Sequence, residues 1–420
     1  MTRALPQQRY TSPEPKSFTF DEVAAIFRPI FSRITEGTLD RERERRLPFE
    51  EVRWLKQQRF GALRVPVHFG GYGLDHASYL RLLIELAEAD PNVAHLFRGH
   101  FAVVEEKLVE PEGNRRTIWL ERLGRGEIVG NASTEPGESQ LGKKSAQLVE
   151  SESGWLLSGT KFYTTGSIFA DWIDVSATRI DSEYVSMIAP RHHRGVDIAD
   201  DWDGFGQRLT GSGTAVFTNV PVEDHAITPR NGRLPYIGAI YQSVLLATLA
   251  GIARSIAKET AALLQSRTRI YSHGNTDLAK DDPQLKQVVG ELGAISFAVE
   301  SILLGTVGLF EAAQAAAQTG DADKARSAAY LVEIEINKAQ IIIADLVPRA
   351  ATRLFDALSA SAVRQDAALD RHWRNARVIL SHNPVVYRAR IVGDYLVNQK
   401  LPDLAWSVGV ANTSQKDAAQ

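Results

Sequence analysis

The sequence predicts an α+β protein, mainly α-helical, in which a small antiparallel β domain lies between two helical domains. Apolar residues recur at helical spacing in the first and last parts of the chain, whereas the middle consists of short alternating runs separated by glycines. The 420 residues are enough for two or three domains or subdomains. We expect an N-terminal arm (1–20), a helical domain (21–126), a β domain (127–230), a C-terminal four-helix bundle (231–402) and a tail (403–420).

The first helical domain is predicted from runs such as SYLRLLIELAEA, residues 78–89, where apolar positions recur every three or four residues. Asp90-Pro91-Asn92 then provides a break and a helix cap before VAHLFRGHFAVVEEKLVE, residues 93–110. Two helices separated by a short turn are therefore expected at this point of the chain.

The β domain is predicted from four segments of alternating or short apolar character bounded by turn residues. They are QLVESESGWLLSGTKFYTTGS (147–167), DWIDVSATRI (171–180), YVSMIAP (184–190) and GTAVFTNVPVEDH (213–225). Segments of this length, bounded by turn residues, are typical of antiparallel strands.

Long helical patterns return in the last part of the chain, including GIARSIAKETAALLQSRTR (251–269) and SAAYLVEIEINKAQIIIADLVPRAATRLFDAL (327–358). Helices with such wide apolar faces need partners, so a four-helix bundle that also packs against other subunits is expected. The uncharged run from Leu234 to Ala253 contains proline, glycines and polar residues, and we interpret it as a buried core helix rather than a membrane span.

Composition excludes several classes of function. A net charge of −3 and a pI of 6.4 provide no overall attraction to nucleic acids or anionic membranes. The first twenty residues lack the apolar segment of a secretory signal, so a cytoplasmic protein is expected. The chain has no cysteine, which excludes disulfides and thiolate catalysis, and its ten histidines show no metal-ligand spacing, so we expect no catalytic metal.

Sulfur is nearly absent, because the chain has only two methionines besides lacking cysteine. Drift in a cysteine-poor enzyme explains this composition as well as synthesis of the protein under sulfur scarcity does.

Five motifs, in order along the chain, resemble segments of the acyl-CoA dehydrogenase superfamily. They are PVHFGGYGLD (66–75), NASTEP (131–136), GTKFYTTGS (159–167), GQRLTGSGTAVFTNVPV (206–222) and RHWRNARVILSHNP (371–384). The resemblance covers nearly the whole chain. It implies the three-domain fold of that superfamily and a flavin held by loops of the β domain, where short polar side chains and glycines suit the polar edge of the ring.

The dehydrogenases of this superfamily need a carboxylate base, and this chain lacks one at both usual positions. The run Arg374-Asn375-Ala376-Arg377 leads to His382-Asn383 instead of a glutamate, and no acidic residue occurs between Arg230 and Lys258. The SHNP segment resembles the flavin-dependent monooxygenase branch, which includes dibenzothiophene monooxygenase and sulfur-scavenging monooxygenases.

That branch implies an enzyme that takes reduced flavin from a separate NAD(P)H-dependent flavin reductase. It adds O2 at flavin C4a and transfers one oxygen atom from the C4a-hydroperoxyflavin to a small substrate. An organosulfur substrate and a homotetramer are expected, with no nucleic acid or membrane partner. The sequence leaves FMN and FAD open as the cofactor.

Residue roles follow from the resemblance. His382 and His100 are the expected proton-transfer groups, because an imidazole titrates near neutral pH. His95 is interpreted as packing or surface. The expected flavin-binding residues, of which Asn131 and Thr165 also count as catalytic, are Asn131, Ser133, Thr134, Thr165 and Arg267, and the expected substrate-pocket residues are Phe169, Trp202 and Phe205.

Two alternatives stay open. One is an acyl-CoA dehydrogenase with a displaced base such as Glu291 or Glu300. The other is a flavin-binding homologue without catalysis, which acts as a structural or regulatory partner.

Overall fold

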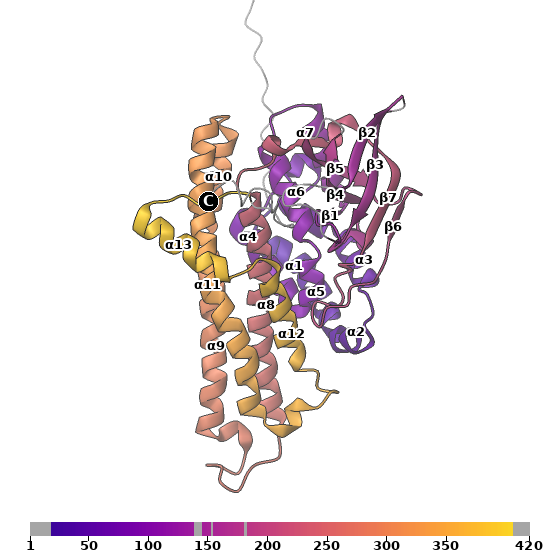
Figure 1. The fold of residues 1–420 in the computed structure, drawn as a ribbon. Helices are drawn as coiled ribbons and strands as arrows, with labels where there is room; N and C mark the ends of the chain where they lie inside the picture. The colour runs from indigo at the N-terminus through magenta and orange to yellow at the C-terminus, as the bar shows by residue number, and fades with distance from the viewer. Residues whose placement is uncertain (1–17, 138–144, 153, 180–182, 406–420) are drawn as a thin grey trace, which may run out of the picture.

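The computed structural model describes residues 18–137, 145–152, 154–179 and 183–405. Residues 1–17 of the expected arm and residues 406–420 of the expected tail lie outside this range. Figure 1 shows a helical domain and a sheet packed side by side against the upper part of a long helical bundle. The predicted fold class is confirmed in this three-part arrangement.

The N-terminal domain is helical. Its helices are α1 (Phe20–Glu36), α2 (Thr38–Glu44), α3 (Phe49–Gln57), α4 (His76–Ala89), α5 (Pro91–His95), α6 (Arg98–Val109) and α7 (Asn114–Gly124). The expected break after α4 is present: Asp90 ends α4, accepts a hydrogen bond from the Asn92 amide, and so caps α5, where Pro91 takes the first position. The cap at Asp90 therefore fixes the position of His95, the last residue of this short helix.

The β domain is one sheet. Its strands are β1 (Val129–Ala132), β2 (Gln147–Ser151), β3 (Gly154–Lys161), β4 (Trp172–Arg179), β5 (Tyr184–Pro190), β6 (Val196–Ile198), β7 (Ala215–Val222) and β8 (Ile227–Pro229). The strand order is β6-β7-β3-β2-β4-β5-β8, with β1 paired to β4.

The sheet is mixed rather than wholly antiparallel, because β1 and β2 both run parallel to β4. Parallel neighbours need a crossover instead of a tight turn, and the β2–β3 hairpin together with the segment from Phe162 to Asp171 provides it. Alternation within single strands does not reveal which strands pair, so the sequence did not distinguish the two kinds of sheet.

The C-terminal domain consists of α8 (Ile237–Ser266), α9 (Pro283–Leu304), α10 (Val307–Gln318), α11 (Ala322–Leu358), α12 (Asp370–His382) and α13 (Val386–Asn398). In Figure 1, α8, α9, α11 and α12 form the bundle, and α13 projects from it. Short 3₁₀ helices occur at η1 (Phe60–Ala62), η2 (Val67–Phe69), η3 (Ser167–Phe169), η4 (Asp224–Ala226), η5 (Arg230–Gly232), η6 (Ala279–Asp281) and η7 (Ala360–Val363).

Two stretches of the described chain are long and apolar enough to cross a membrane, Ile237–Ser266 and Pro283–Gln318. The most apolar window of the first is 78% buried within the protein, as expected for a core helix, and it packs against α4 and α11. The window of the second is only 33% buried, so α9 and α10 retain a large uncovered apolar face.

Candidate active site

The structure brings two histidines together where three parts of the chain meet. His95 is the last residue of α5 and His382 is the last residue of α12, and their ring centroids are 6.4 Å apart. Helix α12 ends at this residue because Asn383 is extended, as the residue before a proline usually is. Two helix ends that are distant in sequence thus present imidazoles to the same space.

Both rings have one nitrogen occupied by an amide oxygen. His95 Nδ1 lies 2.9 Å from Gln207 Oε1, and His382 Nδ1 lies 3.3 Å from Asn383 Oδ1. Because an amide oxygen only accepts, each Nδ1 must carry the proton and donate it. Each neutral ring therefore keeps an unprotonated Nε2, and His95 Nε2 is buried without a partner among the described residues.

The surroundings keep both rings neutral. Burial lowers the pKa of His95 to about 4. The pKa of His382 lies well below its usual value because protein atoms crowd around the ring, and the nearby Arg98 and His95 lower it further. His382 is nevertheless an exposed residue, so its ring is crowded by protein on one side and open to solvent on the other, as for a residue that lines the wall of an open site. Neutral imidazoles that accept protons are expected at pH 7.

An amide network holds the His382 end of the site. Asn383 donates from Nδ2 to Gln242 Oε1 at 2.7 Å, and Gln340 donates to the Asn383 backbone carbonyl at 2.9 Å. These bonds orient the Asn383 side chain with its oxygen toward His382. Helices α8 and α11 thereby fix the tautomer of a histidine on α12.

The β domain contributes to the same region through close backbone packing. A Cβ on Gly99 would lie 2.9 Å from Asn131 Oδ1, and a Cβ on Gly166, whose φ is +79°, would lie 2.3 Å from the Leu96 carbonyl oxygen. The loop with Thr165 and the strand with Asn131 therefore press directly on the turn between α5 and α6. Only glycine permits this approach.

Hydroxyl groups form a chain beside this turn. Thr165 Oγ1 lies 2.6 Å from Ser212 Oγ, which lies 2.7 Å from Thr210 Oγ1. Thr210 donates to the Gln207 carbonyl, and Gln207 is the amide that holds His95. The segment 207–212 therefore links the predicted flavin residue Thr165 to the histidine pair.

Four buried polar atoms in this region have no hydrogen-bond partner within the described residues: Asn131 Oδ1, His95 Nε2, Gln207 Nε2 and Arg98 Nε. Buried polar atoms are nearly always paired, so a cluster of unpaired ones indicates a missing ligand. Mixed donors and acceptors from loops and helix ends suit the polar edge of a flavin ring, which alternates donors and acceptors. The residues present fit the predicted cofactor.

His100, the other expected proton-transfer group, has a different environment. It is fully buried, its Nε2 lies 2.8 Å from the Gly61 carbonyl, and its Nδ1 accepts from the Val129 amide at 3.2 Å. Both ring nitrogens are thus occupied by backbone groups that join the helical domain to β1. Burial also lowers the pKa of His100 to about 4. This geometry favours a structural role, and the histidine that meets His382 is His95.

The remaining expected flavin residues are spread more widely. Ser133 Oγ is 3.1 Å from Ser176 Oγ, and the carbonyl of Thr134 accepts from the Phe162 amide at 2.9 Å. Arg267 directly follows α8 and donates to the Ala357 carbonyl, near the end of α11, at 3.1 Å. It makes no hydrogen bond with either histidine of the pair among the described residues.

The three aromatic residues expected to share a substrate pocket have separate neighbours. Phe169 packs on Phe49 with ring centroids 4.8 Å apart, Trp202 lies 5.8 Å from Tyr163, and Phe205 stacks on Trp373 at 6.0 Å. Trp202 and Phe205 are close in sequence but have different neighbours, because the loop from 202 to 206 folds back on itself. Trp202 Nε1 donates to the Gly206 carbonyl in this loop.

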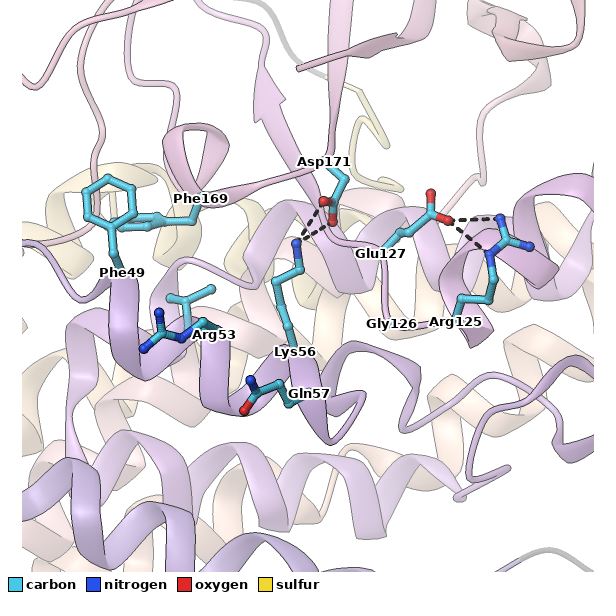
Figure 2. Close-up of a pocket in the computed structure, with 10 residues that line it drawn as sticks. Phe49, Arg53, Lys56, Gln57, Arg125, Gly126, Glu127, Phe169 and Asp171 are labelled. Carbon is cyan, nitrogen blue, oxygen red and sulfur yellow. Dashed lines mark hydrogen bonds and ion pairs between the residues drawn. The ribbon is translucent and has the colours of Figure 1, made fainter. Parts of the chain in front are cut away.

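Phe169 instead lines a cavity of about 480 Å³ between α3 and the start of β4. Figure 2 shows Phe49 and Phe169 at one side of it and two ion pairs, Lys56–Asp171 and Arg125–Glu127, at the other. The charges in this cavity are already paired, and neither histidine of the pair lines it. It is therefore a weaker candidate site than the one with unpaired polar atoms.

No role was predicted from the sequence for Arg98, which lies three residues after His95. It is the first residue of α6, is 8% exposed, and its guanidinium lies 4.3 Å from the centre of the Tyr241 ring. A charged residue inside the apolar run HLFRGHFAVV was the available signal. Gln207 and Gln242 had no such signal, because a glutamine in a loop or helix is ordinary.

Part of this chain matches a known protein family. Residues 243–387 match the family model described as acyl-CoA dehydrogenase, C-terminal domain. A dibenzothiophene monooxygenase of Mycolicibacterium goodii is 27% identical over 84% of this chain and 88% of its own length. The probable FMNH2-dependent monooxygenase SfnC of Pseudomonas putida is 24% identical over 90% of this chain and 95% of its own length.

Solved structures agree in fold. TdsC of Paenibacillus sp. A11-2, crystallised with FMN and indole, superposes with a TM-score of 0.82 at 23% identity, covering 91% of this chain and 99% of that one. The methanesulfinate monooxygenase MsuC of Pseudomonas fluorescens superposes with a TM-score of 0.80 at 23% identity, covering 92% and 98%. This chain therefore has the fold of these monooxygenases, and its residues 243–387 match the C-terminal domain of acyl-CoA dehydrogenases.

The two carboxylates considered as displaced dehydrogenase bases already form ion pairs. Glu291 on α9 pairs with Arg353 at 3.1 Å, and Glu300 pairs with Arg254 at 2.6 Å. Neither makes a hydrogen bond or ion pair with a residue of the histidine pair in the described part of the chain. The described residues also contain no group of three or more histidines and carboxylates arranged to hold a metal.

Proposed function

We propose that the protein is a reduced-flavin-dependent monooxygenase that transfers one oxygen atom of O2 to a small organosulfur substrate, with reduced FMN as its cofactor. The observation that carries the proposal is the pair of neutral imidazoles, His95 and His382, in a chain whose usual dehydrogenase base positions hold no carboxylate. Relatives named as monooxygenases of dibenzothiophene and methanesulfinate support the reaction. The description of SfnC as FMNH2-dependent and the structure of TdsC with FMN support the cofactor.

The chemistry that reduced FMN supplies when bound is the activation of O2 and the two electrons that convert the second oxygen atom to water. Asn131, Thr165 and Gln207 would hold the polar edge of its ring. Ser133 and Thr134 directly follow β1, the strand that carries Asn131. Arg267 would serve the cofactor of a neighbouring subunit, as the resemblance to the superfamily implies.

His382 holds and moves a proton. Its Nδ1 lies 3.3 Å from Asn383 Oδ1, so its Nε2 would accept the proton that is released as oxygen is transferred to the substrate. The same nitrogen would then give that proton to the second oxygen atom, which leaves as water. His95 presents a second unprotonated Nε2 to the same space, held by Gln207. The buried His95 ring helps to keep bulk water, which would favour release of hydrogen peroxide, away from this side of the site.

We further propose that the protein is a cytoplasmic homotetramer and receives its reduced FMN from an NAD(P)H-dependent flavin reductase. The name of SfnC as FMNH2-dependent supports the reductase. The largely uncovered apolar face of α9 and α10 supports the assembly.

Replacement of His382 by alanine tests the function. The truncation is at a helix end, so folding and FMN binding should persist, whereas oxygen transfer should fall by about 10² to 10⁴, the usual contribution of a general acid or base. The ratio of oxygenated product to hydrogen peroxide, at matched FMN occupancy and with a flavin reductase present, is the measurement. His382→Ala should lower this ratio strongly.

An exposed histidine provides the control. His192 lies in a loop before β6, and His192→Ala should leave the product-to-peroxide ratio unchanged. An unchanged ratio in His382→Ala would make His382 structural. Turnover of an acyl-CoA with an electron acceptor at ordinary dehydrogenase rates would contradict the monooxygenase proposal as a whole.

A further inference from the structure

Arg98 differs from the other buried arginines in having no carboxylate. Among the described residues, five arginines are at most 8% exposed. Four of them form ion pairs: Arg41 with Glu51 and Asp90, Arg64 with Glu105, Arg371 with Glu259, and Arg388 with Glu333. Arg98 forms no ion pair or hydrogen bond with its side chain within the described chain, and only the Tyr241 ring lies over its guanidinium.

The carboxylate that contacts Tyr241 already forms an ion pair with another arginine. Tyr241 Oη lies 3.5 Å from Asp174 Oδ2, but Asp174 makes two 2.9 Å hydrogen bonds with Arg233. Arg233 also forms an ion pair with Glu106, with Nε and Oε2 2.7 Å apart. The charge of Arg98 is therefore left without a partner, and burial alone lowers its pKa to about 10.

A buried charge without a partner is costly, so proteins keep one where a ligand supplies the opposite charge. Arg98 Nε is enclosed and unpaired, whereas its two terminal nitrogens are not among the enclosed atoms. A guanidinium in this state offers parallel N–H donors to an oxyanion. The same charge lowers the pKa of both His95 and His382, so it lies close to the proposed catalytic pair.

We propose that Arg98 forms an anion subsite of the active site, which binds the oxyanion group of a small organosulfur acid such as an alkanesulfinate or alkanesulfonate. The proposal rests on the proposed function for its location beside the reacting atoms. It specifies the substrate class: an organic anion rather than a neutral sulfide or thiophene. The candidate flavin residues Asn131 and Thr165 approach from the β domain, whereas Arg98 is held against α8 by Tyr241.

The test compares binding of an anion and of a neutral molecule of similar size to the full-length protein. Sodium methanesulfinate and dimethyl sulfone are titrated at constant ionic strength, with and without FMN, by calorimetry and by thermal shift. The wild type should bind methanesulfinate at least tenfold more tightly than dimethyl sulfone. Arg98→Met should weaken methanesulfinate binding by tenfold or more. The affinity of Arg98→Lys should lie between those of the wild type and Arg98→Met, because lysine keeps the charge but lacks the parallel N–H donors of arginine. Equal affinities of wild type and Arg98→Met for methanesulfinate would overturn the subsite.

The reduced flavin is also an anion, so a second arm measures FMN affinity in oxidised and reduced forms. Arg98→Met should retain the FMN affinity of the wild type within about threefold. A loss of FMN affinity that matches the loss of methanesulfinate affinity would assign the charge to the cofactor and overturn the substrate assignment.

Arg64 is the matched control, because it is equally buried but paired with Glu105. Without ligand, Arg98→Met should melt at the wild-type temperature or above it, since it removes an unpaired charge, and Arg64→Met should melt lower because it leaves Glu105 unpaired. A lower melting temperature for Arg98→Met would show a structural role for Arg98 and overturn the proposal. The selectivity of the wild type for methanesulfinate over dimethyl sulfone tests the subsite without any variant.

The subsite and the function can fail separately. Arg98-dependent binding of methanesulfinate without any oxygenated product would support the subsite and contradict the monooxygenase. Oxygenation of neutral sulfides that is indifferent to Arg98→Met would support the monooxygenase and overturn the subsite.

Discussion

Single histidines differ in whether their ring nitrogens are already occupied. His100 uses both nitrogens on backbone groups, Gly61 and Val129, and so joins η1 of the helical domain to β1. His95 and His382 each use one nitrogen on an amide side chain and keep the other free. A ring nitrogen without a partner is available for proton transfer, whereas a nitrogen bonded to the backbone helps to hold the fold together.

His100→Ala is therefore expected to lower the stability of the protein without changing how oxygen is transferred. Removing the ring leaves a buried carbonyl and a buried amide unpaired and opens a cavity, so the free energy of unfolding should fall by about 3 kcal/mol. Urea unfolding at pH 7 provides the measurement. The folded fraction of the variant should keep the wild-type ratio of product to peroxide. A specific fall in that ratio with unchanged stability would restore His100 as a proton-transfer group.

Two elements carry apolar surface that nothing in the described chain covers. On α9, Phe297 is 75% exposed, and on α13, Val386 and Val397 are 76% and 80% exposed. Helix α13 also projects from the bundle in Figure 1. Contiguous exposed apolar faces on otherwise well-packed helices indicate an interface with another subunit.

These faces predict that assembly depends on α9 and α13. The wild type should sediment at four times the chain mass of 46.3 kDa, and the double variant Phe297→Asp and Val397→Asp should shift toward smaller species, because each carboxylate would be buried at an apolar contact. Sedimentation velocity checks this. Val149→Asp, on the solvent face of β2, should leave the mass unchanged. A monomeric wild type would contradict the tetramer.

The whole molecule buries several histidines in their neutral form. Burial lowers the pKa of His76, His95 and His100 to about 4, from 6.5 in the unfolded chain. Above pH 6.5 both states are neutral and this contribution to stability is complete. Below pH 6.5 the unfolded chain takes up protons that the folded chain cannot, so stability falls as the pH drops from 6.5 toward 4.

The loss of stability between pH 6.5 and pH 4 can be measured directly. Each such imidazole contributes a slope of up to roughly 1.4 kcal/mol per pH unit, so the free energy of unfolding should be several kcal/mol lower at pH 5 than at pH 7. Urea unfolding at the two pH values measures it. His76 stacks on Phe310, and its Nε2 has no partner among the described residues, so His76→Phe should retain folding. Because the pKa values of His372 and His382 are lowered as well, the variant should lower the slope by roughly a fifth. A stability that is flat between pH 7 and 5 would contradict neutral burial.

The fold followed largely from patterns that the sequence displays directly. Helical period, the Asp90-Pro91 cap and the strand-length runs depend on neighbouring residues, so the order of helical domain, sheet and bundle was predictable without coordinates. The motifs that resemble the acyl-CoA dehydrogenase superfamily, and the missing base, were also local features. The parallel pairing of β4 was not, because pairing joins strands that are separated by tens of residues.

The site itself was decided by tertiary structure. Sequence spacing identified histidines, but it did not show that His95 faces His382 while His100 is enclosed by backbone, since those contacts join α5, α12, η1 and β1. The unpaired charge of Arg98 was equally invisible, because a missing partner is recognised only when every neighbour is known. Local patterns fix which elements form. Which polar atoms are left unpaired, and therefore available for chemistry, depends on how distant segments pack.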